Sequence, residues 1–133
     1  MVEDTLSDGK RIAQLLASEL DGRADGALSE LTVVGARPDA EPSTDGTFAY
    51  AVARGDERVA AVYLHPERAR VDVLVAPAAA ADAAADAGLR HRPRAGTPPA
   101  LVAFVEDGGE VKRAAGVVAA ATAATDPDAD AGE

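Results

Sequence analysis

The sequence predicts a single α+β domain, a two-layer sandwich in which helices pack on a mostly antiparallel sheet of four to five strands. Apolar residues recur at helical spacing near both ends of the chain, and the middle carries short runs of alternating apolar residues separated by turn-forming residues. The 133 residues are enough for one core and too few for two. We therefore expect one domain over residues 1–124, with the element order α-β-β-β-β-α-β-α and a helix at each end.

The first predicted helix covers residues 6–21. A capping sequence, Thr5–Asp8, precedes apolar residues that recur at helical spacing: Ile12, Leu15, Leu16 and Leu20. Glycines 22 and 26 follow, as is typical after the end of a helix.

Four short strands are expected next. The first begins at Leu31 and is followed by an acidic loop that runs to Gly46. Residues 48–52 and 58–64 have the pattern of a hairpin, and residues 70–75 add a third strand to an antiparallel meander.

The last third of the chain predicts two helices and one more strand. Pro77 opens an alanine-rich helix over residues 78–87, which Gly88 ends. Residues 89–99 contain three prolines and are expected to form an irregular connection, whereas residues 101–105 are apolar enough for a buried strand. The final helix carries a stripe of small apolar residues: Val111, Ala114, Ala115, Val118 and Ala119. We expect residues 125–133 to be a disordered acidic tail.

The charge composition predicts a protein adapted to concentrated salt. Asp and Glu number 23 against 13 Lys and Arg, a net charge of -10, and only Lys10 and Lys112 are lysines. In molar salt the screening length falls to about 3 Å, so repulsion between carboxylates is weak while they keep the surface hydrated. A GC-rich genome is the alternative explanation: it would account for the many alanines and arginines, but not for the excess of Asp.

The cellular location follows from what the sequence lacks. It contains no cysteine, which excludes disulfides, thiolate catalysis and zinc sites built on cysteine. No stretch has the roughly 20 apolar residues that a membrane span needs, and the N-terminus is acidic where a signal peptide would be basic. We expect a soluble cytoplasmic protein.

Few residues are suited to catalysis. His65 lies in an expected turn near Glu67 and Asp72, and His91 lies among arginines that would lower its pKa. No phosphate-binding loop, dinucleotide fingerprint or nucleophile elbow is present. The sequence therefore favours a protein that is not an enzyme and has no catalytic residue, no metal and no cofactor.

Two basic pairs are candidate anion-binding residues. Lys10 and Arg11 begin the first helix, and Lys112 and Arg113 begin the last one, where free backbone N–H groups also attract anions. The alternative is that all four are ordinary solvated residues, paired with acids such as Glu19.

A second basic patch consists of Arg90, His91, Arg92 and Arg94, joined loosely by Arg68 and Arg70. It could contact an anion or the acidic face of a protein partner. Nucleic acid is an unfavourable partner because the net charge is negative and the aromatic residues form no RNA-stacking motif.

Three segments carry a family resemblance: residues 6–20 (LSDGKRIAQLLASEL), 63–71 (YLHPERARV) and 105–114 (VEDGGEVKRA). In these the chain resembles a group of small uncharacterised proteins of halophilic archaea. The resemblance implies adaptation to salt and a single domain, and it implies no activity or catalytic residue.

From the residues we expect a non-enzymatic binding or protein-interaction module that self-associates through a strand edge or an alanine and valine helix face. The alternative is a sensor or binding domain for a small anion such as phosphate or a nucleotide, held by the two Lys-Arg pairs.

Overall fold

The computed structural model describes residues 8–20, 31–96 and 99–125. In chain order, the elements are α1 (Gly9–Leu20), β1 (Leu31–Val34), β2 (Thr47–Arg54), β3 (Glu57–Leu64), β4 (Ala69–Val73), α2 (Pro77–Ala87), β5 (His91–Arg94), β6 (Ala100–Val105), the 3-10 turn η2 (Gly108–Glu110) and α3 (Val111–Ala124). The mixed α+β class is confirmed.

The sheet is larger than expected. It has six strands in the order β1-β2-β3-β4-β6-β5, and all neighbouring strands are antiparallel. The prediction of four to five strands was wrong because β5 forms inside residues 89–99, which were expected to be irregular. β5 is an edge strand, and an edge strand can contain a proline because half of its N–H groups face no neighbour.

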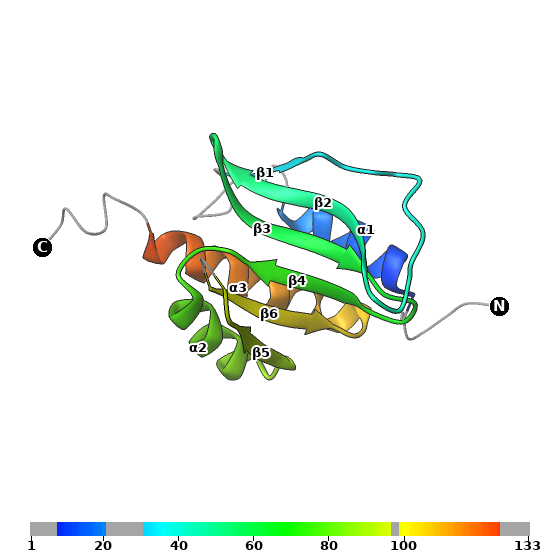
Figure 1. Cartoon of the computed structure of the whole chain (residues 1–133). Helices are drawn as coiled ribbons and strands as arrows, with labels where there is room; N and C mark the ends of the chain where they lie inside the picture. The colour runs from blue at the N-terminus through cyan, green and yellow to red at the C-terminus, as the bar shows by residue number, and fades with distance from the viewer. Residues whose placement is uncertain (1–7, 21–30, 97–98, 126–133) are drawn as a thin grey trace, which may run out of the picture.

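The hydrophobic core lies between one face of the sheet and the helices. In Figure 1, α1 and α3 pass behind the strands, and α2 lies beside α3. Ile12, Leu16 and Leu20 of α1 are fully buried, which confirms the helical spacing in the sequence. Tyr50 points into this core, where its hydroxyl donates to the Ala13 carbonyl oxygen at 2.7 Å; burial raises the pKa of the Tyr50 hydroxyl.

The alanine-rich helix packs through its smallest side chains. Ala80 and Ala84 are fully buried, and Asp82 and Asp86 lie on the exposed side of α2. Gly88 ends the helix with a φ of 73°, in the left-handed region that favours glycine. The small residues let α2 pack closely against α3 and the edge of the sheet formed by β5 and β6.

Several predicted boundaries differ by a few residues. The first helix begins at Gly9 after the capping residue Asp8; residues 6, 7 and 21 lie outside the described residues, as do glycines 22 and 26. The predicted strand 70–75 is Ala69–Val73 in the structure. Of the predicted acidic tail, only Thr125 is described, and the remainder, 126–133, lies outside the described residues.

Candidate functional site

The face of the sheet opposite the helices carries a row of side chains across four strands. Register pairs place Phe48 opposite Tyr63, Tyr63 opposite Arg70, and Arg70 opposite Phe104. Paired residues of adjacent strands share a face of the sheet. None of the described helices packs on this face, where Phe48, Tyr63 and Arg70 are partly exposed and Phe104 is buried.

Arginines gather around this row. The chain has eleven, since two of its thirteen basic residues are lysines, and six of them lie on or beside the uncovered face: Arg37, Arg58, Arg68, Arg70, Arg92 and Arg94. We call these six residues, together with Phe48, Tyr63, Asp72 and Phe104, the arginine face. More than half of the arginines of an acidic chain therefore lie on one surface.

Guanidinium groups cover the aromatic rings of the arginine face. Arg70 lies 4.2 Å from the ring centroid of Tyr63, and Arg68 lies 4.3 Å from that of Phe104. Arg37 and Arg92 approach the rings of Phe48 and Phe104, each at 5.8 Å. Cation-π contacts of this kind hold a guanidinium group over the face of an aromatic ring.

Asp72 fixes two of the arginines. Its side chain is 1% exposed, and it accepts hydrogen bonds from Arg70 Nε at 3.0 Å and from Arg94 Nη1 at 2.6 Å. A buried carboxylate is stable only when it is fully paired, and two guanidinium partners meet that need. The pairing holds Arg70 and Arg94 in place on the surface.

The arginine face is hollowed at its centre. The hollow has a volume of about 660 Å³ and is lined by Gly35, Arg37, Thr47, Phe48, Arg58, Ala61, Tyr63, Asp72, Leu74 and Arg94. This volume is in the range of ligand-binding clefts. The lining contains three arginines and a single carboxylate, so it is suited to a negatively charged group.

Three guanidinium groups of the arginine face are unpaired. Among the described residues, Arg37, Arg58 and Arg92 have no carboxylate partner, although the chain is rich in carboxylates. All three side chains belong to exposed residues. They are available to a carboxylate or phosphate from outside the domain.

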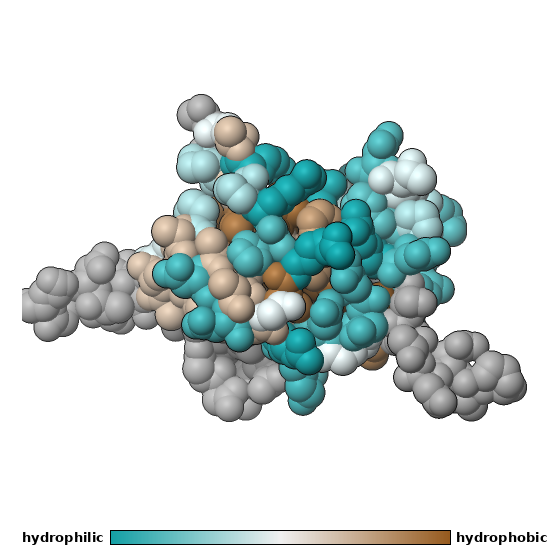
Figure 2. All heavy atoms as spheres, turned by 90° about the horizontal axis from the view of Figure 1, so that it is seen from below, coloured by the Kyte–Doolittle hydropathy of each residue, from teal (hydrophilic) through white to brown (hydrophobic). Residues whose placement is uncertain are grey.

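A second, smaller hollow of about 200 Å³ lies between α1 and the segment that follows β1. Apart from Lys10, Gln14, Arg37 and Tyr50, its lining is apolar. Seen from below, the molecule likewise shows a few apolar side chains surrounded by hydrophilic ones (Figure 2). The described residues contain no group of three His, Asp or Glu that could hold a metal.

His65 is held by backbone and not by an acid. Its Nδ1 lies 3.1 Å from the carbonyl oxygen of Thr44, and its Nε2 is buried without a hydrogen-bond partner. Burial lowers the pKa of the His65 ring, the hydrogen bond to Thr44 raises it, and the charges of Arg70 and Arg68 lower it further. Without a carboxylate to orient it, this histidine lacks the arrangement of a general base.

The structure places the two Lys-Arg pairs at separate points. Lys10 Nζ lies 3.7 Å from Glu41, whereas Lys112 Nζ lies 3.9 Å from Glu19. Glu19 is nine residues beyond Lys10 on α1, about 13 Å along the helix axis. Arg113 donates to the carbonyl oxygen of Ala87 at 3.3 Å, and Arg11 is exposed.

Carboxylates of the chain also occupy the helix N-termini. Asp8 accepts hydrogen bonds from the backbone N–H groups of Lys10 and Arg11, and Asp107 accepts one from Glu110 ahead of α3. These are N–H groups that an external anion would use. Anion binding by Lys10, Arg11, Lys112 and Arg113 remains a prediction, and it would require the anion to displace a carboxylate.

The second basic patch divides between the two faces of the sheet. His91 is opposite Ala103, a core residue, and its Nδ1 lies 2.8 Å from the Leu89 carbonyl oxygen. Arg90 pairs with Glu106 at 3.3 Å. Arg92 and Arg94 belong to the arginine face, as do Arg68 and Arg70, which were expected to join this patch loosely.

Sequence reasoning grouped four of the six arginines of the arginine face in one basic patch (Arg68, Arg70, Arg92 and Arg94), and it missed the other two and the aromatic residues. Arg37 and Arg58 come from separate loops and strands, and nothing local connects them with Phe48 or Tyr63. The alternation of apolar residues in 48–52 and 58–64 could have indicated this face. Alternate residues of a strand point to opposite faces of the sheet, so the residues between the buried ones form a second set on the other face.

Among the described residues, the fold is α+β, with three helices on one side of a six-stranded antiparallel sheet and an arginine-rich face on the other. The chain belongs to a family of unknown function, DUF7993, which matches residues 1–133. Neither a curated protein nor a solved structure gave a match. Within the described residues, no helix has the length and apolar character to cross a membrane.

Proposed function

We propose that this protein is a non-enzymatic binding module whose arginine face receives an acidic segment of a protein partner. The observation that carries the proposal is a set of three guanidinium groups, Arg37, Arg58 and Arg92, that have no carboxylate partner among the described residues and lie on one face of a chain with a net charge of -10. Intramolecular carboxylates are abundant, so leaving these arginines unpaired on a single surface favours an external anionic partner.

The chemistry of the face favours carboxylates over nucleotide bases. Phe104 is only 7% exposed, and guanidinium groups lie over the rings of Phe104 and Tyr63. Bases that stack on proteins need accessible aromatic faces, whereas guanidinium groups bind carboxylates in a bidentate way.

The arginine face and the acidic remainder of the surface favour self-association in which these two different surfaces meet. The outer edge strand β5 contains Pro93 and two arginines, features that discourage pairing of sheet edges. We therefore infer that a second copy presents acidic surface to the arginine face and does not extend the sheet at β5. Light scattering at rising protein concentration tests this, because a strict monomer would contradict self-association.

We further propose that the protein works in a salt-rich cytoplasm of a halophilic archaeon. Its net charge of -10 and its two lysines support the proposal. Thermal unfolding should occur at a higher temperature in about 2 M KCl than in about 0.15 M KCl, since salt screens carboxylate repulsion. An unchanged or lower unfolding temperature would contradict it.

The test of binding uses a labelled peptide of alternating Asp and Gly residues, with an Asn-Gly peptide and a single-stranded oligonucleotide as comparisons. The double variant Arg37→Gln/Arg58→Gln should lose at least about tenfold in affinity for the acidic peptide, since each charged contact contributes about 1 kcal/mol or more. The matched control is Arg11→Gln/Arg113→Gln, which removes the same charge from the helix starts. Loss of affinity in the control instead would favour the alternative, an anion site at the Lys-Arg pairs. Tighter binding of the oligonucleotide would overturn the acidic-segment proposal.

A further inference from the structure

The smaller hollow, beside α1, has a buried floor and an exposed rim. The floor consists of buried residues of α1, β2 and β3: Ala13, Ala49, Tyr50 and Leu64. The rim consists of exposed residues of α1 and of the segment after β1: Gln14, Ala36, Arg37 and Pro38. A ligand can therefore enter from solvent at the rim and reach apolar side chains at the floor.

The hollow is open because alanines line it where larger side chains would fill it. Ala13 and Ala17 lie one turn apart on α1, and Ala36 and Ala49 line the hollow from the segment after β1 and from β2. Atoms that face an empty space lose dispersion contacts on that side. An apolar ligand in the hollow would restore those contacts.

Backbone and side-chain hydrogen bonds hold the walls of the hollow in place. The N–H group of Arg37 donates to the Ala49 carbonyl oxygen at 2.8 Å, and the Arg37 carbonyl oxygen accepts from the N–H group of Ala40 at 3.0 Å. The Tyr50 hydroxyl already donates to the Ala13 carbonyl oxygen. Walls that are fixed in advance lower the cost of binding, and the floor favours an apolar group because its hydroxyl is already bonded.

The charged residues that line the hollow are both cations. Lys10 and Arg37 line it, whereas none of the described residues in its lining is an Asp or Glu. Lys10 lies 3.7 Å from Glu41, whose side chain is 82% exposed, and an exposed ion pair of this kind is weak. Arg37 has no carboxylate partner among the described residues. Both cations are available to an anionic group at the rim.

The volume of the hollow limits the size of its ligand. The hollow measures about 200 Å³. An apolar protein cavity of about 150 Å³ accepts benzene, whereas pockets for drug-sized molecules begin at about 300 Å³. The apolar part of a fitting ligand therefore has about six carbon atoms.

We propose that this hollow binds a small monocarboxylate, with an apolar chain or ring of about six carbon atoms on the floor and the carboxylate paired with Lys10 and Arg37. The hollow is distinct from the one on the arginine face, although Arg37 lines both. The inference therefore does not rest on the proposed function.

The test titrates the isotopically labelled full-length protein with hexanoate, hexan-1-ol and hexylammonium and follows the backbone amide signals by NMR. Hexanoate should bind in the millimolar range, as a ligand of so few atoms does. It should bind about fivefold more tightly than hexan-1-ol, because only hexanoate carries a carboxylate, and hexylammonium should bind least. The signals that shift should belong to residues 10–17 and 36–38.

A charge variant tests the role of the two cations. Lys10→Gln/Arg37→Gln should bind hexanoate and hexan-1-ol with affinities within about twofold of each other. The matched control, Lys112→Gln/Arg58→Gln, removes one lysine and one arginine that do not line this hollow. The control should keep the preference for hexanoate.

Two filling variants test the apolar part of the site. Ala17→Leu should weaken both hexanoate and hexan-1-ol about fivefold or more, because the larger side chain occupies the space. The matched control is Ala81→Leu, at a residue of α2 that is also partly buried against the core. Ala36→Leu, at the exposed rim, makes the same test without changing a core contact.

Other outcomes would overturn the proposal. Equal affinity of wild type for hexanoate and hexan-1-ol would show that no cation holds the carboxylate. Loss of hexanoate binding in the Arg58 control variant would place the carboxylate on the arginine face, which overturns this site and leaves the proposed function standing. The absence of millimolar binding by any probe, or unchanged binding by both filling variants, would also overturn it.

Discussion

Arg94 Nη1 donates to Asp72 Oδ2 at 2.6 Å, although the two residues belong to strands that are not neighbours. The bond passes over β6 and links β4 to the edge strand β5. This side-chain hydrogen bond connects the edge strand β5 to the inner strand β4, which form no backbone hydrogen bonds with each other. The pairing therefore contributes both to the integrity of the sheet edge and to the shape of the arginine face.

Replacing the buried carboxylate should destabilise the protein. Asp72→Asn leaves Arg70 and Arg94 facing a neutral group, and breaking a buried charge pair costs about 3 kcal/mol of unfolding free energy. Urea unfolding measures the change, with the exposed Asp56→Asn as the control, expected within about 0.5 kcal/mol of wild type. A loss below about 1 kcal/mol would show that Asp72 is not a structural link.

Replacing glycine with alanine at two helical positions should change the free energy of unfolding in opposite directions. A Cβ at Gly9 would overlap the backbone oxygens of His65 and Arg68, whereas a Cβ at Gly116 would meet nothing. We expect Gly9→Ala to cost about 2 kcal/mol or more, because backbone must move. Gly116→Ala, in the exposed middle of α3, should stabilise by about 0.5–1 kcal/mol. Thermal unfolding of both variants gives the comparison, and equal effects would contradict the close approach of α1 to the loop after β3.

Stability should depend on pH through His65. Burial lowers the pKa of this ring in the folded state, so its contribution to stability is present above the unfolded value near 6.5 and is lost as pH falls below that value. Wild type should lose more unfolding free energy than His65→Gln between pH 7.5 and 5, since carboxylate effects are common to both. If the two proteins lost the same amount, the ring would not be held neutral.

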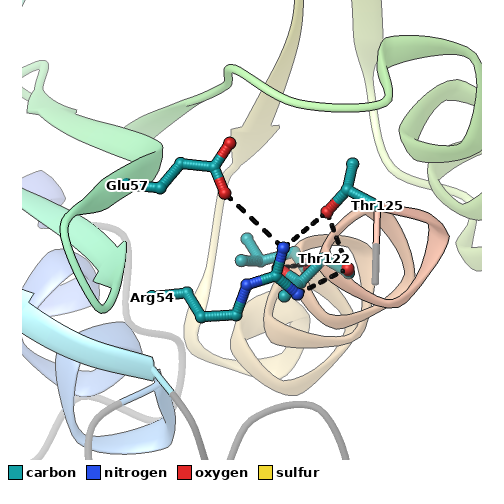
Figure 3. A network of polar contacts seen from close by, with 5 residues as sticks. Arg54, Glu57, Thr122 and Thr125 are labelled. Atoms are coloured by element: carbon teal, nitrogen blue, oxygen red, sulfur yellow. Dashed lines mark hydrogen bonds and ion pairs between the residues drawn. The ribbon is translucent and has the colours of Figure 1, made fainter. Parts of the chain in front are cut away.

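Arg54 should stabilise the last turn of α3. It contacts both Thr122 and Thr125 (Figure 3), and its positive charge lies at the carbonyl end of the helix. Arg54→Gln should cost about 1–2 kcal/mol and raise amide hydrogen exchange in the last turn of α3. Arg58→Gln, which lacks such contacts, should leave exchange there unchanged. Equal exchange in both variants would show that the helix end does not depend on Arg54.

Elements with strong local signals were predictable from the sequence. The spacing of Ile12, Leu16 and Leu20 predicted α1, and Pro77 with Gly88 predicted both ends of α2. These signals lie within a few residues of one another and depend on backbone geometry alone.

The sixth strand and the arginine face were not predictable in the same way. Pro93 and its neighbouring arginines are unfavourable in a central strand, and only the position of β5 at the sheet edge permits them. Tyr63 and Phe48, whose rings meet edge to face at 5.8 Å, are fifteen residues apart and come together through strand register. Register depends on the whole sheet, including bulges near Phe48 and Val52 that no single segment specifies.

The hydrophobic core lies on the helix side of the sheet, so side chains on the opposite face can be replaced without changing the core. Its buried hydrophobic cluster includes Val62, Val71 and Leu101 on the helix side, whereas the six arginines lie outside that cluster. Folding and the proposed recognition thus depend on largely separate sets of side chains of the same strands. Exposed residues such as Arg37, Arg58 and Arg92 can be randomised as a library to redirect recognition, with the packed helices serving as an unaltered scaffold.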